Sequence, residues 1–159
     1  ISVYSEVGHG TRVSLFFPRI GTTATKGASS TDASAPQGSG ETILVVEDDP
    51  DVRLVTVPRL ESLGYRVKVA VDGPSALEVV RKEPGIQLAL IDVVMPGGMD
   101  GHTLSDEIEK IAPLIKLILT SGYSPRMAQN GGKPDRPFLP KPSSRAQLAQ
   151  LVRRVMLAS

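Results

Sequence analysis

No cysteine occurs among the 159 residues, so disulfide bonds and thiolate metal sites are excluded. No apolar run reaches the ~18 residues that suggest a membrane-spanning helix, and residues 1–20 lack the charged start and continuous apolar stretch of a signal peptide. An excess of charge of one sign is also missing, because 18 Lys and Arg nearly balance 17 Asp and Glu, which gives no indication of nucleic acid as a partner. The composition favours a soluble, cytoplasmic module, and because the chain starts with Ile1 rather than Met we expect a fragment of a longer protein.

Two segments precede the main part of the chain. Residues 20–40 consist mainly of small and polar residues, and few of their side chains could offset the entropy lost on ordering. We therefore predict a flexible linker over residues 20–40. Before it, residues 1–19 contain alternating apolar positions punctuated by Gly8 and Gly10, which predicts a β-hairpin. Because a lone hairpin is marginal in water, we expect it to be a remnant of a larger domain.

Residues 41–159 alternate short apolar runs with stretches whose apolar residues recur at helical spacing. The pattern predicts strands near residues 43–46, 67–69, 88–91, 115–119 and 138–139, and helices near residues 52–63, 74–82, 104–111 and 148–155. The apolar runs are too continuous for a half-exposed sheet, which implies a parallel sheet covered on both faces. The predicted fold class is therefore α/β, a flavodoxin-like doubly wound sheet of five parallel strands in the order 2-1-3-4-5.

Two of the predicted helices fit the pattern less well than the rest. The first carries Val52, Val55, Leu60 and Leu63 on one face, yet it contains Pro58, which removes a backbone hydrogen bond. Residues 122–137 hold the place of a fourth helix but are rich in Gly and Pro, so we expect that helix to be short or loosely formed.

Polar side chains follow the predicted strands at their carboxyl ends, where ligands collect in open α/β sheets. Clustered carboxylates repel one another unless a cation neutralises them, and hard oxygen ligands favour Mg²⁺. An aspartate beside such a metal can attack a phosphoryl group, and an ammonium and a hydroxyl can balance the phosphoryl oxygens. The residues in question are Glu47, Asp48 and Asp49 after the first strand, Asp92 at the third, Thr120 and Ser121 at the fourth, and Lys141 at the fifth.

Residues 42–157 resemble the receiver domains of bacterial response regulators. The motifs that carry the resemblance are ILVVEDD at 43–49, LIDVVMPGGMDG at 90–101, LILTSGY at 117–123 and FLPKP at 138–142. The resemblance implies that Asp92 is the phosphoacceptor, that Lys141 binds the phosphate, and that Ser121 rather than Thr120 is the switch hydroxyl. It also implies that Phe138 is the aromatic that moves with this hydroxyl, although plain core packing of Phe138 is equally compatible with the sequence.

The same resemblance implies the metal ligands. Asp48, Asp92 and the backbone carbonyl of Val94 would bind Mg²⁺, with Glu47 acting mainly through water. Asp49, followed by Pro50, is instead assigned mainly to the cap of the first helix.

Two departures from the family pattern concern the surroundings of this site. Gly97 and Gly98 lengthen the loop after Asp92, and Ser143 stands where an aromatic residue is frequent. The second departure, with the weak fourth helix, puts in doubt the usual output surface of the fourth helix, fifth strand and fifth helix.

Residues 1–18 resemble the last hairpin of a histidine-kinase ATP-binding domain, in the pattern Ser5…Gly8-His9-Gly10-Thr11…Phe17-Pro18. The ATP-binding boxes and the phosphorylatable histidine region of such a kinase are absent from the sequence. We therefore expect this segment neither to bind ATP nor to phosphorylate a histidine. A kinase remnant at 1–19, a linker at 20–40 and a receiver at 41–159 suggest the end of a hybrid histidine kinase.

The function implied by the resemblance is a phosphorelay in which Asp92 accepts a phosphoryl group from a phosphohistidine and the domain switches conformation for a partner. The implied partners are the phosphohistidine domain of a histidine kinase or a histidine phosphotransfer protein. We expect no nucleic acid and no membrane contact by the fragment, and leave open a phosphorylation-dependent homodimer and membrane anchoring of the parent. The fragment would catalyse only its own phosphorylation, so its status as an enzyme stays open, whereas the parent is expected to be a histidine kinase.

Two other functions use similar residues. A phosphohydrolase with an aspartate nucleophile usually has a second Asp two residues later, and Val94 at that position argues against it. A scaffold that signals without phosphate would not need the complete set of acids, hydroxyl and lysine, although failure to bind Mg²⁺ would favour it.

Overall fold

The computed structural model describes residues 2–6, 8, 10–14, 36–96, 98–122 and 136–158. Five strands form a parallel sheet in the order β4-β3-β5-β6-β7, which is the order 2-1-3-4-5 when the strands are counted from β3. The predicted doubly wound α/β fold is therefore confirmed. The elements are β1 (Ser2–Glu6), β2 (Gly10–Ser14), β3 (Thr42–Val46), α1 (Pro50–Ser62), β4 (Arg66–Ala70), α2 (Gly73–Lys82), β5 (Ile86–Asp92), α3 (Gly101–Ile111), β6 (Lys116–Ser121), β7 (Phe138–Pro140) and α5 (Arg145–Leu157).

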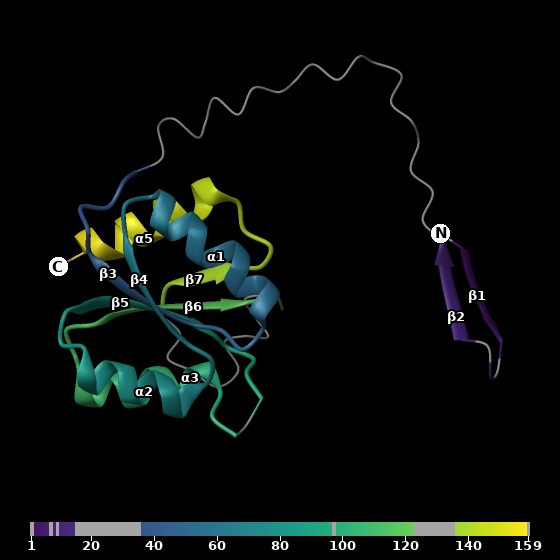
Figure 1. Ribbon diagram of the computed structural model, residues 1–159, viewed down its shortest axis with the longest axis horizontal. Coiled ribbons are helices and arrows are strands. Elements are labelled where there is room, and N and C mark those ends of the chain that lie inside the picture. Colours follow the sequence, from purple (N-terminus) through teal and green to yellow (C-terminus); the bar gives the residue numbers. More distant parts are fainter. Residues whose placement is uncertain are drawn as a thin grey trace, which may run out of the picture.

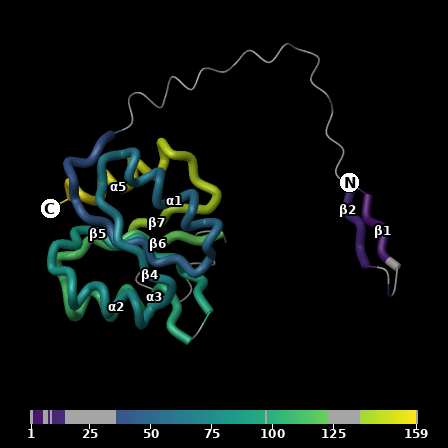
Figure 2. The backbone as a smooth tube through the Cα atoms, viewed as in Figure 1, coloured from purple at the N-terminus to yellow at the C-terminus, as the bar shows by residue number. Residues whose placement is uncertain are grey.

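Helices cover both faces of the sheet, as the continuous apolar strands predicted. Figure 1 shows α1 and α5 on one face and α2 and α3 on the other. Leu60 of α1 and Leu148 of α5 pack in one apolar cluster, and Leu104 and Ile108 of α3 pack in the other. Figure 2 shows α5, at the end of the chain, running beside α1. The central strands are consequently buried on both sides, and all five residues of β3 are buried.

Each of the four described helices begins at a side chain that caps its first turn. These side chains accept hydrogen bonds from free backbone N–H groups, which have no partner within the helix. Asp49 thus has the capping role that the sequence predicted, because it accepts from the backbone of Asp51 at 2.8 Å. The other caps are Asp72, Asp100 and Ser144.

The apolar face predicted for the first helix is only partly buried. Leu60 and Leu63 are fully buried, but Val55 on the same face has 48% of its surface exposed. Val55 lies beside a cleft between α1 and the start of α5, so no side chain covers it there. The helix continues through Pro58 to Ser62. Most of residues 122–137, where a weak fourth helix was predicted, lie outside the described residues.

The predicted hairpin is present as the antiparallel pair β1 and β2, in a register that runs from Ser2 opposite Ser14 to Glu6 opposite Gly10. Gly8 and Gly10 have φ angles of 84° and 85°, which glycine adopts without steric cost. The turn therefore depends on the two glycines from which it was predicted.

The residues just before the sheet contact the turn that follows α1. The backbone N–H of Gly38 donates to the carbonyl of Leu63 at 2.7 Å, and that of Gly40 donates to Gly64 at 3.0 Å. A Cβ at Gly38 would lie 2.4 Å from the ring of Tyr65, so this close approach needs glycine. Gly38 and Gly40, at the end of the predicted linker, therefore contact the larger domain.

Among the described residues, none of the helices combines the length and the apolar character that a membrane crossing requires.

Candidate functional site

The carboxyl ends of four strands bring polar side chains to one edge of the sheet. In the parallel register Asp92 of β5 lies opposite Thr120 of β6, and Ser121 lies opposite Pro140, one residue before Lys141. Glu47 directly follows β3, which pairs with β5. The residues predicted to lie at this edge are therefore adjacent in the folded chain.

Three carboxylates form the centre of this edge. Glu47, Asp48 and Asp92 each offer an oxygen, and these oxygens all lie within 4.8 Å of one another. Glu47 and Asp92 are buried, with 4% and 7% of their surface exposed, and Asp48 is partly exposed. Carboxylates this close repel one another unless a cation lies between them.

Lys141 supplies one such cation. Its Nζ donates to an oxygen of Glu47 at 2.5 Å and to an oxygen of Asp92 at 2.6 Å. Its backbone N–H donates to the carbonyl of Ser121 at 2.8 Å, which holds the residue against the end of β6. Lys141 thus bridges two carboxylates that come from different strand ends.

Burial and charge act against each other in this group. Burial raises the pKa of Glu47 above its ordinary value, although the hydrogen bond and charge of Lys141 partly oppose the shift. Burial disfavours the Lys141 ammonium, but its bonds to Asp92 and Glu47 outweigh that effect and raise its pKa. The ammonium therefore stays charged at neutral pH.

The chain around Asp92 turns back on itself. The backbone N–H of Val94 donates to a carboxylate oxygen of Asp92 at 3.1 Å, and that of Gly101 donates to the carbonyl of Val93 at 3.0 Å. A Cβ at Gly101 would lie 2.2 Å from the carbonyl oxygen of Asp92, so only glycine fits. The start of α3 therefore packs directly against the backbone of Asp92, a contact that the sequence analysis missed.

The two hydroxyl residues at the end of β6 are both buried. Thr120 has 5% and Ser121 has 1% of its surface exposed. Phe138 is partly buried and packs against the cluster beneath α2 and α3. The switch roles of Ser121 and Phe138 thus remain predictions, and core packing accounts for the observed position of Phe138.

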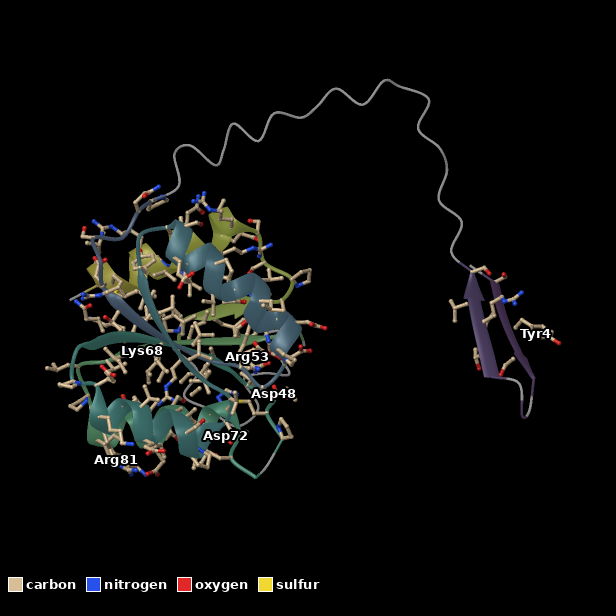
Figure 3. The ribbon with its side chains drawn as sticks, in the orientation of Figure 1. Tyr4, Asp48, Arg53, Lys68, Asp72 and Arg81 are labelled. Carbon is tan, nitrogen blue, oxygen red and sulfur yellow. The ribbon has the colours of Figure 1, made fainter. Side chains whose placement is uncertain are left out.

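Arg53, on the first turns of α1, is a further residue that the sequence analysis did not single out. One nitrogen of its guanidinium donates to the carbonyl of Glu47 at 2.6 Å and to that of Asp48 at 2.7 Å. Figure 3 labels Asp48 and Arg53 close together where α1 begins. The sequence did show an arginine shortly after an acidic pair and a helix cap. Its hydrogen-bond acceptors are backbone carbonyls, however, and these cannot be recognised in a sequence.

A cleft of about 500 Å³ opens beside the acidic group, between α1 and the connection from β7 to α5. Glu47 and Lys141 form part of its wall, so the cleft is continuous with the site. The remainder of the wall is mostly apolar and includes Val45, Val52, Val55, Thr56, Arg59, Leu90, Leu139, Ser143 and Leu148.

The donor set at this edge suits a hard divalent cation. It offers carboxylate oxygens, and within the described part of the chain neither histidine nor cysteine belongs to the group. Mg²⁺ prefers oxygen ligands and needs only one or two carboxylates, because it keeps several waters. The residues present therefore fit a magnesium ion.

A family model, the response regulator receiver domain, matches residues 43–153. The sensor kinase CckA of Brucella abortus is 39% identical over 163 residues, a match that covers 96% of this chain. The chain spans 17% of the length of that kinase.

Solved structures agree with the sequence matches. The receiver domain of the hybrid histidine kinase CckA is 34% identical, with a TM-score of 0.61 over 72% of this chain and 98% of that one. The response regulator TrrA of Thermotoga maritima, solved in complex with Mg²⁺ and BeF, is 27% identical. Its TM-score is 0.65, over 72% of this chain and 98% of that one.

Proposed function

The chain belongs to the response regulator receiver domain family of two-component phosphorelay systems, and from that membership we propose that Asp92 accepts a phosphoryl group from a phosphohistidine. The observation that carries the proposal is the position of Lys141, whose Nζ lies 2.6 Å from Asp92 and 2.5 Å from Glu47. An ammonium held beside a buried carboxylate suits a site that must receive further negative charge.

In the proposed reaction an oxygen of the Asp92 carboxylate attacks the phosphorus atom of the phosphohistidine. The P–N bond breaks, its electron pair leaves with the imidazole nitrogen, and an acyl phosphate forms at Asp92. Lys141, which donates to the free carboxylate, then donates to a phosphoryl oxygen. The chemistry requires little more than position and charge, both of which this edge of the sheet supplies.

Glu47, Asp48 and Asp92 would hold Mg²⁺ at this edge, together with the backbone carbonyl of Val94. The bound ion would neutralise charge on the phosphoryl oxygens. Two of the three carboxylates are buried, which limits their freedom to move toward other partners.

After transfer we propose that the Ser121 hydroxyl donates to a phosphoryl oxygen and that Phe138 moves with it. Such a switch is a change in the populations of two existing states, biased by contacts that only the phosphorylated state makes. The buried position of Ser121, one residue beyond the partner of Asp92 in the sheet, supports this role.

We further propose that residues 1–19 are the end of a histidine-kinase ATP-binding domain, that residues 20–40 are a linker, and that the parent is a hybrid kinase. The match to the sensor kinase CckA supports this, because it covers 96% of the chain and so extends beyond the receiver. The phosphodonor would then be a histidine of the parent kinase or of a histidine phosphotransfer protein.

The test is intact-mass analysis after incubation with acetyl phosphate and Mg²⁺, comparing the wild type with Asp92→Asn. We expect the wild type to gain one phosphoryl group and Asp92→Asn to gain none. Asp72→Asn is the matched control, because Asp72 also follows a strand at this edge but caps α2, a role that Asn fills.

Equal phosphorylation of the wild type and Asp92→Asn would assign the acceptor to another residue. No phosphorylation of the wild type by acetyl phosphate or by phosphohistidine donors would favour the scaffold function.

A further inference from the structure

Arg53 joins the start of α1 to the turn that carries the acidic pair. One guanidinium nitrogen donates to two consecutive carbonyls, those of Glu47 at 2.6 Å and Asp48 at 2.7 Å. Both bonds are partly buried, which shields them from competition with water. Bonds from a charged donor are also stronger than those between neutral groups. The side chain therefore restrains two adjacent peptide units at once.

The same turn is restrained on its other sides by further hydrogen bonds. The backbone N–H of Glu47 donates to the carbonyl of Ala70 at 3.1 Å, and Asp49 caps the helix that follows. Between these two points Arg53 provides the side-chain contact to the carbonyls of Glu47 and Asp48. The directions in which the Glu47 and Asp48 side chains leave the backbone depend on the orientation of those peptide units.

Arg53 forms no ion pair with a carboxylate in the part of the chain that the structure describes. Its charge is directed to backbone oxygens instead, although the two residues that carry those oxygens, Glu47 and Asp48, have carboxylates of their own. An arginine that served only to neutralise the acidic group would be expected to contact a carboxylate, as Lys141 does. The contacts of Arg53 act on backbone geometry.

We propose that Arg53 is a positioning residue that orients Glu47 and Asp48 for a divalent cation, an inference that rests on the Mg²⁺ site of the proposed function. Residues that orient metal ligands without touching the metal typically change metal affinity about 10–100-fold when they are replaced. Arg53 contacts the backbone of two such ligands through a single nitrogen. Its removal should leave the carboxylates in place but less well ordered for the ion.

The direction in which the Kd for Mg²⁺ changes distinguishes a positioning role of Arg53 from an effect of its charge. Arg53→Met removes a positive charge near the site, and that change alone would strengthen the binding of Mg²⁺. Loss of ligand orientation acts in the opposite direction. Weaker Mg²⁺ binding by Arg53→Met therefore cannot be explained by electrostatics and identifies the positioning role.

The experiment is calorimetric titration of the full chain with Mg²⁺, without any phosphodonor. We expect the Kd of Arg53→Met to rise about tenfold or more, and Arg53→Lys, which keeps the charge and one donor, to lie between it and the wild type. The matched control is Arg59→Met, on the same helix. Arg59 also donates from one nitrogen to a backbone carbonyl, but that carbonyl belongs to Ser143, and its loss should not raise the Kd.

Thermal unfolding and the Mg²⁺ dependence of acetyl phosphate labelling complete the test. A positioning role predicts that labelling of Arg53→Met needs more Mg²⁺ but approaches the wild-type rate at saturation. An unchanged or lower Kd for Arg53→Met, with a loss of Tm like that of Arg59→Met, would show a merely structural contact and overturn the inference. If Arg53→Met does not fold, Arg53→Lys and Arg53→Gln are compared with the wild type by the same titration.

Failure of this inference is distinguishable from failure of the proposed function. Mg²⁺ binding by the wild type without labelling of Asp92 would contradict phosphoryl transfer but leave the Arg53 comparison intact. Absence of Mg²⁺ binding by the wild type would overturn the role of Arg53 and the metal site together.

Discussion

The helices α1 and α3, on opposite faces of the sheet, are attached in different ways, and α5, which shares the face of α1, buries Leu148, Leu151 and Val152. On one face α3 buries Leu104 and Ile108 completely, and α2 buries Ala76 completely. On the other face α1 buries only Leu60 among its own residues, and Leu54 is 72% exposed. Apolar packing thus attaches α2 and α3, whereas α1 contributes little to the core.

Polar bonds attach α1 instead. Arg59 donates to the carbonyl of Ser143 at 2.8 Å, and Arg145 of α5 donates to the carbonyl of Ser62 at 3.3 Å. Between these links lies the cleft of about 500 Å³. Among the four described helices, α1 is thus attached largely by directional bonds, which fix an orientation more specifically than apolar contact does.

The largest expected difference between α1 and α3 comes from removing a leucine. Leu104→Ala on α3 should lower the free energy of unfolding by about 2–5 kcal/mol, because it leaves a cavity in a closed core. Leu54→Ala on α1 should change it by less than about 0.5 kcal/mol, since Leu54 is exposed. Urea unfolding with a common m-value measures both. Similar losses would mean that α1 is packed as closely as α3.

Introducing a leucine should change the free energy of unfolding in opposite directions at a filled site on α2 and at the cleft beside α1. Ala76→Leu should destabilise by about 1–3 kcal/mol, because Ala76 is fully buried in a filled core. Thr56→Leu, on the wall of the cleft, should stabilise by about 1 kcal/mol by filling space. Chemical denaturation of the two variants measures the signs directly. A loss of stability in Thr56→Leu would contradict an open cleft.

The smallest expected effect concerns the start of α3. The backbone N–H of Thr103 lowers the pKa of Asp100 below its ordinary value of 3.8. The stabilisation linked to this charge is present above that value and is lost as the pH falls through the lowered pKa. Asp100→Ala should cost about 1 kcal/mol at neutral pH through loss of the cap.

The urea midpoint between neutral pH and pH about 3 tests this linkage. The difference in urea midpoint between the wild type and Asp100→Ala should become smaller as the pH falls. Asp100→Asn, which keeps a capping oxygen without the charge, should lose less at neutral pH and show a flatter dependence. A gap that does not change with pH would assign the whole effect to helix propensity.

Much of the fold could be predicted because its signals are local. Apolar runs predicted the strands, and Asp49 before Pro50 predicted the start of α1. Helical spacing put Val55 on one face with Leu60, but spacing does not show whether another element covers that face, and Val55 stays exposed. The contact of Gly101 with Asp92 was missed for a related reason, since nothing in a sequence shows how closely two backbones approach.

The candidate site also contains residues that the sequence predicted and one that it did not. The order of the motifs placed Glu47, Asp92 and Lys141 at strand ends of one sheet, and the structure brings them together. The role of Arg53 could not be predicted, because its acceptors are backbone carbonyls, which every residue possesses.

By itself the sequence determined the alternation of strands and helices, the helix caps and the chemical types available at the carboxyl edge, because these depend on neighbouring residues. Only the tertiary structure decided that Lys141 bridges carboxylates 49 and 94 residues away, and that α1 borders a cleft. Those outcomes depend on the register of parallel strands and on the volume left between α1 and α5. Both are set by the whole sheet and its helices together, and no local stretch of sequence contains them.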